Sequence, residues 1–317
     1  MQSIEIKKRI ISAGFTQVGF LNDERNRNSI IIAAFPYNLN NAKAAKGVRI
    51  SPFARNNHYG EAVNRLKKIA LFIREEKLLI KKDIRIFCNS QLEEKWFAAK
   101  SGLGFYGRNS LIITKEAGSR VILAGLIVPF KLESDKELEN ATIPGVMCGS
   151  CRACINACPT NAIESKGYIN RDKCLQSLTT DDRILPEDIM EKWENRLYGC
   201  SICQDCCPFN KNPRSKSAEY SDSPNKKRIL SDSELKGFIG ESVPFEFMLH
   251  ANDSEMKAFF KGTALSMSWI KYDNLRRNTI ISTVFEQRSD LLNELEEFLN
   301  HKSLSYAAKW AIKKLTT

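Results

Sequence analysis

The sequence has no stretch of about 18 consecutive apolar residues, which is the length a helix needs to cross a bilayer. Its first residues, Met1–Arg9, include one acidic and three basic side chains and lack the apolar core of a signal peptide. The sequence therefore predicts no membrane span and a cytoplasmic location.

Histidine is scarce, and no two histidines have the spacing of metal ligands, so we expect each on the surface or in a loop. The three histidines are His58, His250 and His301. The tryptophans occur in helical patterns and are expected in the core rather than as platforms for base stacking. The four tryptophans are Trp96, Trp193, Trp269 and Trp310.

Cysteine, by contrast, is concentrated in one segment. Nine of the ten cysteines lie between Cys148 and Cys207, and Cys88 lies outside. The first four are spaced C-x2-C-x2-C-x3-C and are followed by Pro159, as in bacterial-type [4Fe–4S] sites. Disulfide frameworks belong to short secreted chains, and a tetrahedral zinc ion fits this spacing less well than a cluster. We therefore favour iron–sulfur clusters over disulfides and over zinc.

In such sites the cysteine before the proline ligates the other cluster, which predicts two interlocked ligand sets. The first set is Cys148, Cys151, Cys154 and Cys207, and the second set is Cys158, Cys174, Cys200 and Cys203. Cys206 is an alternative to Cys207, but a C-x2-C-x3-C-P pattern that ends on Cys207 fits better. The chain has a net charge of +11, which is typical both of proteins that bind RNA and of a solvated lysine-rich surface.

The fold class expected from the patterns is α+β. Residues 1–130 alternate between helical and strand patterns, which predicts an α/β sheet domain. Within it, helices are expected at 1–13, 59–77 and 92–100, and strands at 16–21, 29–36, 84–88, 111–114 and 120–128. The run 29–36 is apolar throughout, as in a strand covered on both faces. Residues 131–212 are expected to form a ferredoxin-like cluster domain, and 213–317 a linker and a helical tail.

A glycine-rich segment, Gly102–Asn109, has the letters G-x-G-x-x-G of dinucleotide-binding loops. It follows a helix rather than a strand and lacks the acidic residue of such sites, so a dinucleotide site is disfavoured. Two interpretations stay open: a tight turn that needs small residues, or a loop that lets the backbone approach a large flat cofactor.

The order of these motifs resembles the epoxyqueuosine reductase family, whose members catalyse the last step of queuosine synthesis in tRNA. The resemblance rests on the segments 6–20, 50–59, 101–109, 147–163, 171–174, 195–211, 275–278 and 307–311. The last two segments are similar to the HEAT-like helical tail of that family.

This resemblance implies two [4Fe–4S] clusters, a base-off cobalamin in the α/β domain, and an epoxyqueuosine substrate in the anticodon loop of a tRNA. It also implies a low-potential electron donor such as flavodoxin or ferredoxin, and a monomer, with tRNA against the basic surface and the helix of Arg276 and Arg277. By position, the cofactor-binding residues are Ser51, Arg55, Gly104, Asn109, Ile112, Leu123, Ala124 and Gly125.

The sequence departs from the family at three points. Cys88 stands where the family has a proton-donating Asp. A thiol at this position can donate a proton or react with reduced cobalt. The alternative to such a functional role is a buried structural cysteine at the end of a strand. The family's segment between the first two strands is reduced to residues 21–29, and the helical tail is short. Two other functions therefore stay open: a corrinoid iron–sulfur reductase with a different substrate, and a non-enzymatic electron carrier with two clusters.

Overall fold

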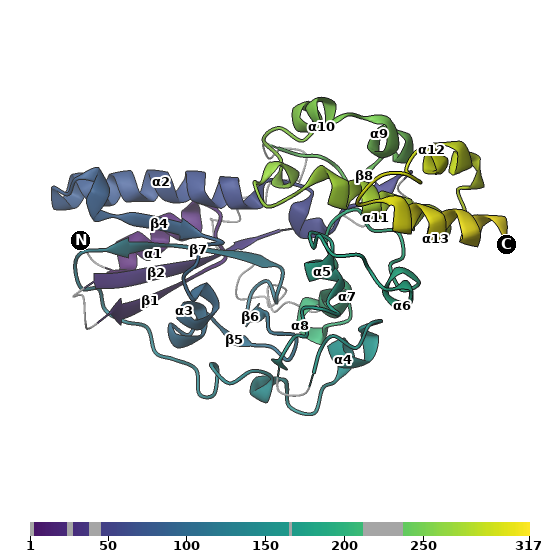
Figure 1. Cartoon of the computed structure of the whole chain (residues 1–317). Coiled ribbons are helices and arrows are strands. Elements are labelled where there is room, and N and C mark those ends of the chain that lie inside the picture. The colour runs from purple at the N-terminus through teal and green to yellow at the C-terminus, as the bar shows by residue number, and fades with distance from the viewer. Residues whose placement is uncertain (1–2, 24–27, 38–45, 165–166, 212–236) are drawn as a thin grey trace.

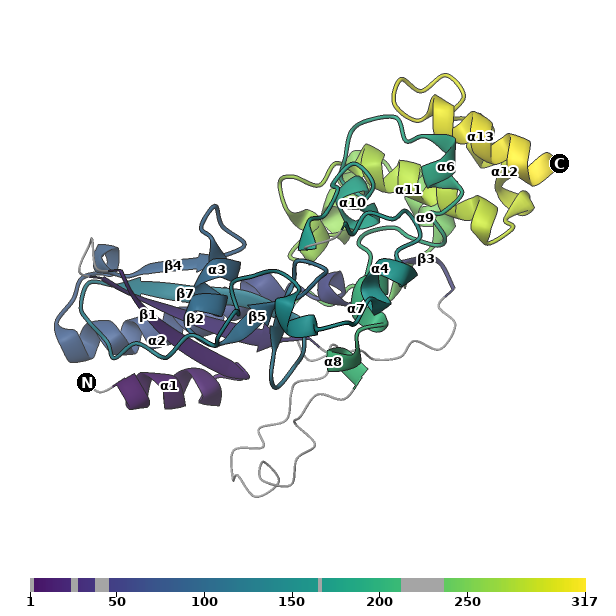
Figure 2. The ribbon, with the colours of Figure 1, turned by 90° about the horizontal axis from the view of Figure 1, so that it is seen from below.

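A computed structural model of the protein describes residues 3–23, 28–37, 46–164, 167–211 and 237–317. The described parts form an elongated molecule (Figure 1). A sheet domain near the N-terminus and a helical tail at the C-terminus lie at opposite ends, and the cysteine-rich segment lies between them in both views (Figure 2).

The sheet domain is built on four strands in the order β1-β2-β7-β4, and every neighbouring pair is antiparallel. The strands are β1 (Gln17–Asp23), β2 (Asn28–Pro36), β4 (Arg85–Cys88) and β7 (Val121–Val128). In the central pair, Ile32 lies opposite Gly125 and Ala33 opposite Ala124. The predicted strands are present, and the α+β class is confirmed.

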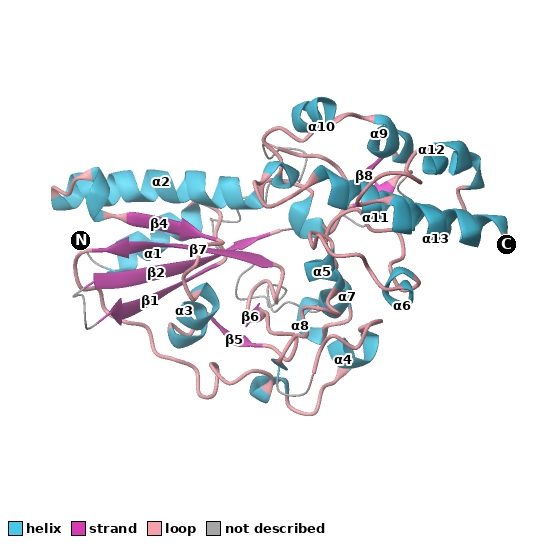
Figure 3. Cartoon of the chain, in the orientation of Figure 1, coloured by secondary structure: helices cyan, strands magenta, loops and turns pink. Residues whose placement is uncertain are grey.

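Helices cover both faces of this sheet (Figure 3). The helices are α1 (Ser3–Ser12), α2 (His58–Lys77) and α3 (Glu94–Lys100). Ile31 and Ala33 of β2 share an apolar core with α1 and α2, whereas Ile30 and Ile32 share another core with α3. Successive residues of β2 therefore point into two apolar cores, which explains why the run 29–36 carries no polar alternation.

The glycine-rich segment is only partly the loop that the sequence predicts, because β5 (Gly104–Tyr106) lies within it and pairs with β6 (Ile112–Thr114). A Cβ atom added to Gly104 would lie 2.6 Å from the carbonyl oxygen of Ile113. The glycine is thus required for close pairing of two short strands, which is a structural use of the residue.

The cysteine-rich segment consists of short helices joined by tight turns. The helices are α4 (Ala153–Ala157), α5 (Leu175–Leu178), α6 (Glu187–Met190), α7 (Ile202–Asp205) and α8 (Pro208–Lys211). The predicted linker, which begins at residue 213, lies outside the described residues as far as residue 236.

The helical tail does not have an apolar core of its own. Its helices are α9 (Phe245–His250), α10 (Asp253–Phe259), α11 (Tyr272–Phe285), α12 (Leu292–Glu296) and α13 (Ser305–Thr316). Leu275 and Trp310 of the tail share one core with Ile50, Leu178 and Trp193. A two-stranded sheet of β3 (Val48–Arg49) and β8 (Ser242–Val243) adds backbone hydrogen bonds between the tail and the loop before α2.

Two of the four tryptophans contradict the prediction of core positions. Trp193 and Trp310 are buried, but Trp96 and Trp269 are 38% and 48% exposed. A helical pattern identifies the face of a helix but not whether another element covers that face, which depends on the tertiary fold.

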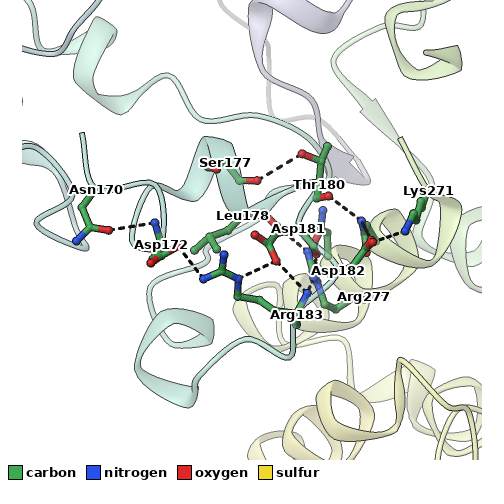
Figure 4. Close-up of polar contacts among 12 residues, drawn as sticks. Asn170, Asp172, Ser177, Leu178, Thr180, Asp181, Asp182, Arg183, Lys271 and Arg277 are labelled. Carbon is green, nitrogen blue, oxygen red and sulfur yellow. Dashed lines mark hydrogen bonds and ion pairs between the residues drawn. The ribbon is translucent and has the colours of Figure 1, made fainter. Parts of the chain in front are cut away.

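The expectation that Arg276 and Arg277 face tRNA is wrong. Both side chains are buried, at 9% and 4% exposure. Arg277 donates to the carbonyl oxygens of Leu178, Asp181 and Arg183 (Figure 4). A guanidinium group has five N–H donors, so it satisfies several carbonyls at the end of a short helix at once. Arg277 thus fastens α11 to the cysteine-rich segment, whereas Arg276 bonds Ala251 and Asp253 within the tail.

Candidate iron–sulfur and cofactor site

The ten cysteines are all free thiols, and eight of them, without Cys88 and Cys206, form two groups. In the first group, Cys148 and Cys207 lie near enough to Cys154 to raise the pKa of its thiol. Cys148 and Cys151 raise the pKa of Cys207 in the same way. In the second group, Cys158 and Cys174 raise the pKa of Cys200. Cys174 and Cys200 raise the pKa of Cys203. Members of each predicted set thus lie near one another, but the two groups also adjoin, because Cys206 and Cys203 both lie near Cys154. The division into two sets of four ligands stays a prediction.

The remaining thiol of the segment, Cys206, lies beside the first group. It raises the pKa of Cys154, and Cys207 raises the pKa of Cys206. Within the described ranges, no three side chains of His, Cys, Asp or Glu come close enough to hold a single metal ion. A zinc ion would need its thiolates at about 2.3 Å from one centre. The preference for clusters over zinc rests on the spacing of the cysteines in the sequence.

Backbone N–H groups point at sulfurs in both groups. The N–H of Arg108 donates to Sγ of Cys148 at 3.4 Å, and the N–H of Ala162 donates to Sγ of Cys158 at 3.3 Å. Hydrogen bonds of this kind stabilise thiolate charge and tune the reduction potential of a cluster. The side chain of Arg108 also donates to the carbonyl oxygen of Cys151 at 3.1 Å, so the glycine-rich segment holds the first cysteine loop.

Burial favours the neutral form of these thiols when no metal is bound. It raises the pKa of Cys154 to about 11 and also raises the pKa of Cys203. Nearby thiols raise both pKa values further, because two thiolates at close range repel each other. Iron must displace these protons, so cluster assembly releases protons and is favoured at higher pH.

A buried polar network joins the cysteine-rich segment to one end of the sheet. The side-chain amide of Gln204 donates to the hydroxyl of Tyr37 at 2.9 Å and to the carbonyl oxygen of Ser119 at 2.8 Å. Asn210 donates to the hydroxyl of Ser119 at 2.9 Å and to the carbonyl oxygen of Gln204 at 2.7 Å. Since Tyr37 follows β2 and Ser119 precedes β7, the network fixes the cluster ligands relative to the central strands.

An open pocket of about 150 Å³ lies at the same end of the sheet. Its walls come from α2, from β4 and α3, from β6 and from β7, and they combine aliphatic with polar side chains. The aliphatic side chains include Ile112, Val121 and Leu123, and the polar ones include Tyr59, Glu94 and Lys95. Ile112 also belongs to the apolar core that contains Cys148 and Cys207, so β6 connects the pocket to the first thiol group.

Two of the predicted cofactor residues, Ile112 and Leu123, line this pocket. Ala124 is buried in the core under α1 and α2. Gly125 serves the packing of the sheet, because a Cβ atom there would lie 2.4 Å from the ring of Phe87.

The other predicted cofactor residues lie around the junction of the domains. The N–H of Ser51 bonds the carbonyl oxygen of Tyr198, and Arg55 forms an ion pair with Glu241 at 2.9 Å. Gly104 lies in β5, as described above. Asn109 donates to the carbonyl oxygen of Cys203 at 3.4 Å and thereby contacts the second thiol group.

Cys88 is the last residue of β4 and is partly buried. The loss of solvent around its thiol raises its pKa to about 12, with a further contribution from the charge of Glu94. Glu94 was not singled out by the sequence reasoning. Acidic residues are common in the first turn of a helix, where they complement the helix dipole, so its position gave no functional signal.

His58 contradicts the expectation of a surface or loop position. It is completely buried at the start of α2, in contact with the rings of Phe35 and Tyr37. Burial lowers its pKa to about 4, so the ring is neutral at physiological pH. It therefore acts as an internal aromatic contact behind the pocket.

Comparison with known proteins agrees with this geometry. Residues 147–210, which contain all eight predicted ligands, match the family of 4Fe-4S double cluster binding domains. The protein is therefore an iron–sulfur protein in which a double-cluster domain adjoins the pocket of an α+β sheet domain. Within the described residues, no helix is long and apolar enough to cross a membrane.

Curated relatives are epoxyqueuosine reductases. The protein from Bacillus subtilis is 32% identical over 230 residues, which are 71% of this chain and 54% of that protein. The protein from Gloeobacter violaceus is 28% identical over 282 residues, which are 84% of this chain and 83% of that protein. With the first relatives it matches, the chain spans about half of their length, namely 57% for Prochlorococcus marinus and 54% for Bacillus subtilis.

Solved structures give the same relationship. The epoxyqueuosine reductase of Bacillus subtilis, with its catalytic loop swung out of the active site, has a TM-score of 0.76 and 26% identity over 98% of this chain and 90% of that chain. An epoxyqueuosine reductase bound to an epoxyqueuosine-modified tRNA-Tyr stem loop has a TM-score of 0.79 and 25% identity, covering 99% of this chain and 90% of that chain. The resemblance predicted from the motifs is confirmed: the chain is a divergent relative of the epoxyqueuosine reductases.

Proposed function

We propose that the protein is a cobalamin- and iron–sulfur-dependent reductase that converts epoxyqueuosine to queuosine in the anticodon loop of tRNA, as a cytoplasmic monomer. The observation that carries this proposal is the junction described above. A buried network of Tyr37, Ser119, Gln204 and Asn210 holds a double-cluster domain against the end of the sheet where the pocket opens. This arrangement suits electron delivery from the clusters to a reaction in the pocket.

The proposed reaction converts an epoxide to an alkene. It consumes two electrons and two protons, breaks both carbon–oxygen bonds of the ring and releases the oxygen as water. A bound cobalamin would supply a strongly reducing cobalt centre. A low-potential donor such as flavodoxin or ferredoxin would supply the electrons, which the two clusters pass on one at a time.

The lining of the pocket suits part of a corrinoid. Ile112 and Leu123 offer an aliphatic surface to the face of a large flat ring, and Tyr59 offers a polar edge. Sites for drug-sized ligands enclose about 300–1,000 Å³. At about 150 Å³, the pocket is smaller than such sites, so its side chains would contact only part of a bound corrinoid.

The remaining cofactor residues predicted by position would act near the ring rather than in this pocket. Ser51 and Arg55 border the junction with the tail, and Asn109 links the pocket region to the carbonyl of Cys203. Gly104, Ala124 and Gly125 would contribute through the packing of their strands.

For tRNA, the net charge of +11 supports phosphate contacts, which give affinity without sequence specificity. Specificity would come from a modified base turned out of the anticodon loop into the pocket. A relative of similar fold binds such a stem loop. The buried Arg276 and Arg277 would take no part in this contact.

Anaerobic reconstitution followed by transfer to substrate tests the proposal. We expect about eight iron atoms per chain, on the basis of two [4Fe–4S] clusters, together with one corrinoid. Deletion of the gene should cause epoxyqueuosine to accumulate in tRNA. Iron without any bound corrinoid would contradict the proposal and favour an electron carrier.

Cys88 favours a second candidate, a corrinoid iron–sulfur reductase of a different substrate. Its thiol stands where the family has a proton-donating carboxylate, and its pKa of about 12 makes it a poor donor near neutral pH. Bound corrinoid combined with unchanged epoxyqueuosine in tRNA of the deletion strain would support this candidate.

A further inference from the structure

The turn between β4 and α3 brings a carboxylate to the end of the strand that Cys88 terminates. Asn89 has a left-handed backbone, with φ of 49°, and reverses the chain after Cys88. The N–H groups of Asn89 and Ser90 then donate to the carboxylate of Glu94 at 3.2 and 2.8 Å. The hydroxyl of Ser90 donates to the same carboxylate at 2.9 Å. Glu94 is thereby fixed in one orientation beside the strand end.

The two side chains face different surroundings. Cys88 packs against the apolar core under α1 and α2. Glu94 lines the pocket together with Tyr59, Lys95 and Ile112. A group that protonates a bound substrate must reach the pocket, and the carboxylate meets this condition better than the thiol does.

We propose that Glu94, rather than Cys88, is the proton donor for the substrate in this pocket. The proposal rests on the proposed reductase function. As the first carbon–oxygen bond of the epoxide breaks, the oxygen takes the proton of the Glu94 carboxyl group. The clusters supply the two electrons, solvent supplies the second proton and reprotonates Glu94, and the oxygen leaves as water.

The environment of Glu94 suits this role. Burial raises its pKa, although the hydrogen bonds from Ser90 and Asn89 oppose the shift. The titratable groups that face it are Cys88 on β4, Tyr59 on α2 and its neighbour Lys95. The ammonium group of Lys95 donates to the carbonyl oxygen of Ser110 at 3.0 Å, which directs its charge toward the loop before β6. An acid with a pKa nearer to ambient pH transfers its proton more readily than a thiol with a pKa of about 12.

Three variants of the reconstituted holoprotein test the assignment. Glu94→Gln keeps an oxygen that accepts the hydrogen bonds of the turn but has no acidic proton. Cys88→Ser removes the thiol, and Glu93→Gln is a matched control at the neighbouring exposed position. With epoxyqueuosine-containing tRNA, we expect the single-turnover rate of Glu94→Gln to fall ~100-fold or more, the range of general acid catalysis. The other two variants should stay within about 3-fold of the unsubstituted protein, since neither removes the donor.

A second readout does not depend on turnover. Infrared difference spectra of the holoprotein between pH 5 and pH 8 should contain the band of a protonated carboxyl group that titrates above the usual range of Glu. The band should be absent in Glu94→Gln and present in Glu93→Gln and Cys88→Ser, and iron content confirms that each variant folds.

Loss of the rate in Cys88→Ser with retention in Glu94→Gln would overturn the proposal. If the unsubstituted protein does not reduce epoxyqueuosine, the proposed function fails, and the infrared spectra decide on Glu94 separately. A raised titration of its band keeps Glu94 as the acid of the pocket, and an ordinary titration overturns that role as well.

Discussion

The buried network between the cysteine-rich segment and the sheet should depend on Gln204, whose contribution to the unfolding free energy should be coupled to that of Tyr37. This side chain is buried and bonds Tyr37 and the carbonyl oxygen of Ser119. Gln204→Leu preserves much of the volume but leaves two buried polar groups without partners. Each unsatisfied group costs about 1–3 kcal/mol, so we expect a total loss of about 2–6 kcal/mol of unfolding free energy.

The double variant isolates the contact with Tyr37. Tyr37→Phe removes the hydroxyl group that Gln204→Leu would leave unpaired, so in that background Gln204→Leu should cost about 1–2 kcal/mol less than alone. Thermal unfolding of the reconstituted protein is the assay, with a shift of about 2–4 °C per kcal/mol for a chain of this size. Additive effects of the two substitutions, within about 0.5 kcal/mol, would refute the coupling.

Three further predictions concern the tail, His58 and the cluster loop. Arg277→Met should lower the unfolding free energy by about 3–5 kcal/mol, because buried carbonyl oxygens lose their donor. The control Arg183→Met, at an exposed ion pair, should lower it by less than about 1 kcal/mol. Thermal unfolding measures both effects. The pKa of His58 is about 4 in the folded protein and 6.5 in the unfolded chain, so its contribution to the unfolding free energy should be complete above pH 6.5 and fall by about 3 kcal/mol toward pH 4. His58→Phe should flatten this part of the dependence of the melting temperature on pH. An unchanged dependence would contradict the assignment. Arg108→Met should release the first cysteine loop and reduce iron from about eight toward about four atoms per chain. The control Cys206→Ser should leave the iron content unchanged. Equal iron content in both variants would argue that Arg108 does not hold this loop.

The cluster ligands could be predicted because their information is local. Thiolates spaced two or three residues apart must meet around one cluster, so Cys148–Cys158 reveal their chemistry without knowledge of the fold. The strands were predictable for a similar reason, since the apolar run of β2 reports burial on both faces. The strand within the glycine-rich segment was not, because its pairing partner, β6, is a separate element.

Features that depend on distant contacts could not be predicted. His58 has the sequence context of an exposed helix start, and its burial comes from Phe35 and Tyr37 on another element. Glu94 became a candidate only when the turn at Asn89 placed its carboxylate beside the pocket. A basic residue such as Arg277 is typical both of RNA contacts and of buried caps, and the carbonyls that reveal its use as a cap lie about a hundred residues earlier in the chain.

Arg277 and Asn278 connect the helical tail to the cysteine-rich segment. Cys174, a predicted ligand of the second cluster, is the N-cap residue of α5, and Arg277 bonds the carbonyl oxygen of Leu178 at the other end of that helix, at 2.7 Å. Asn278 holds the next carbonyl, that of Thr179, at 2.9 Å, and also the carbonyl of Leu197 at 2.8 Å, three residues before Cys200. Side chains from one turn of α11 therefore support the backbone next to two ligands of the same cluster. This turn of α11 therefore helps to hold the backbone geometry around the second thiol group.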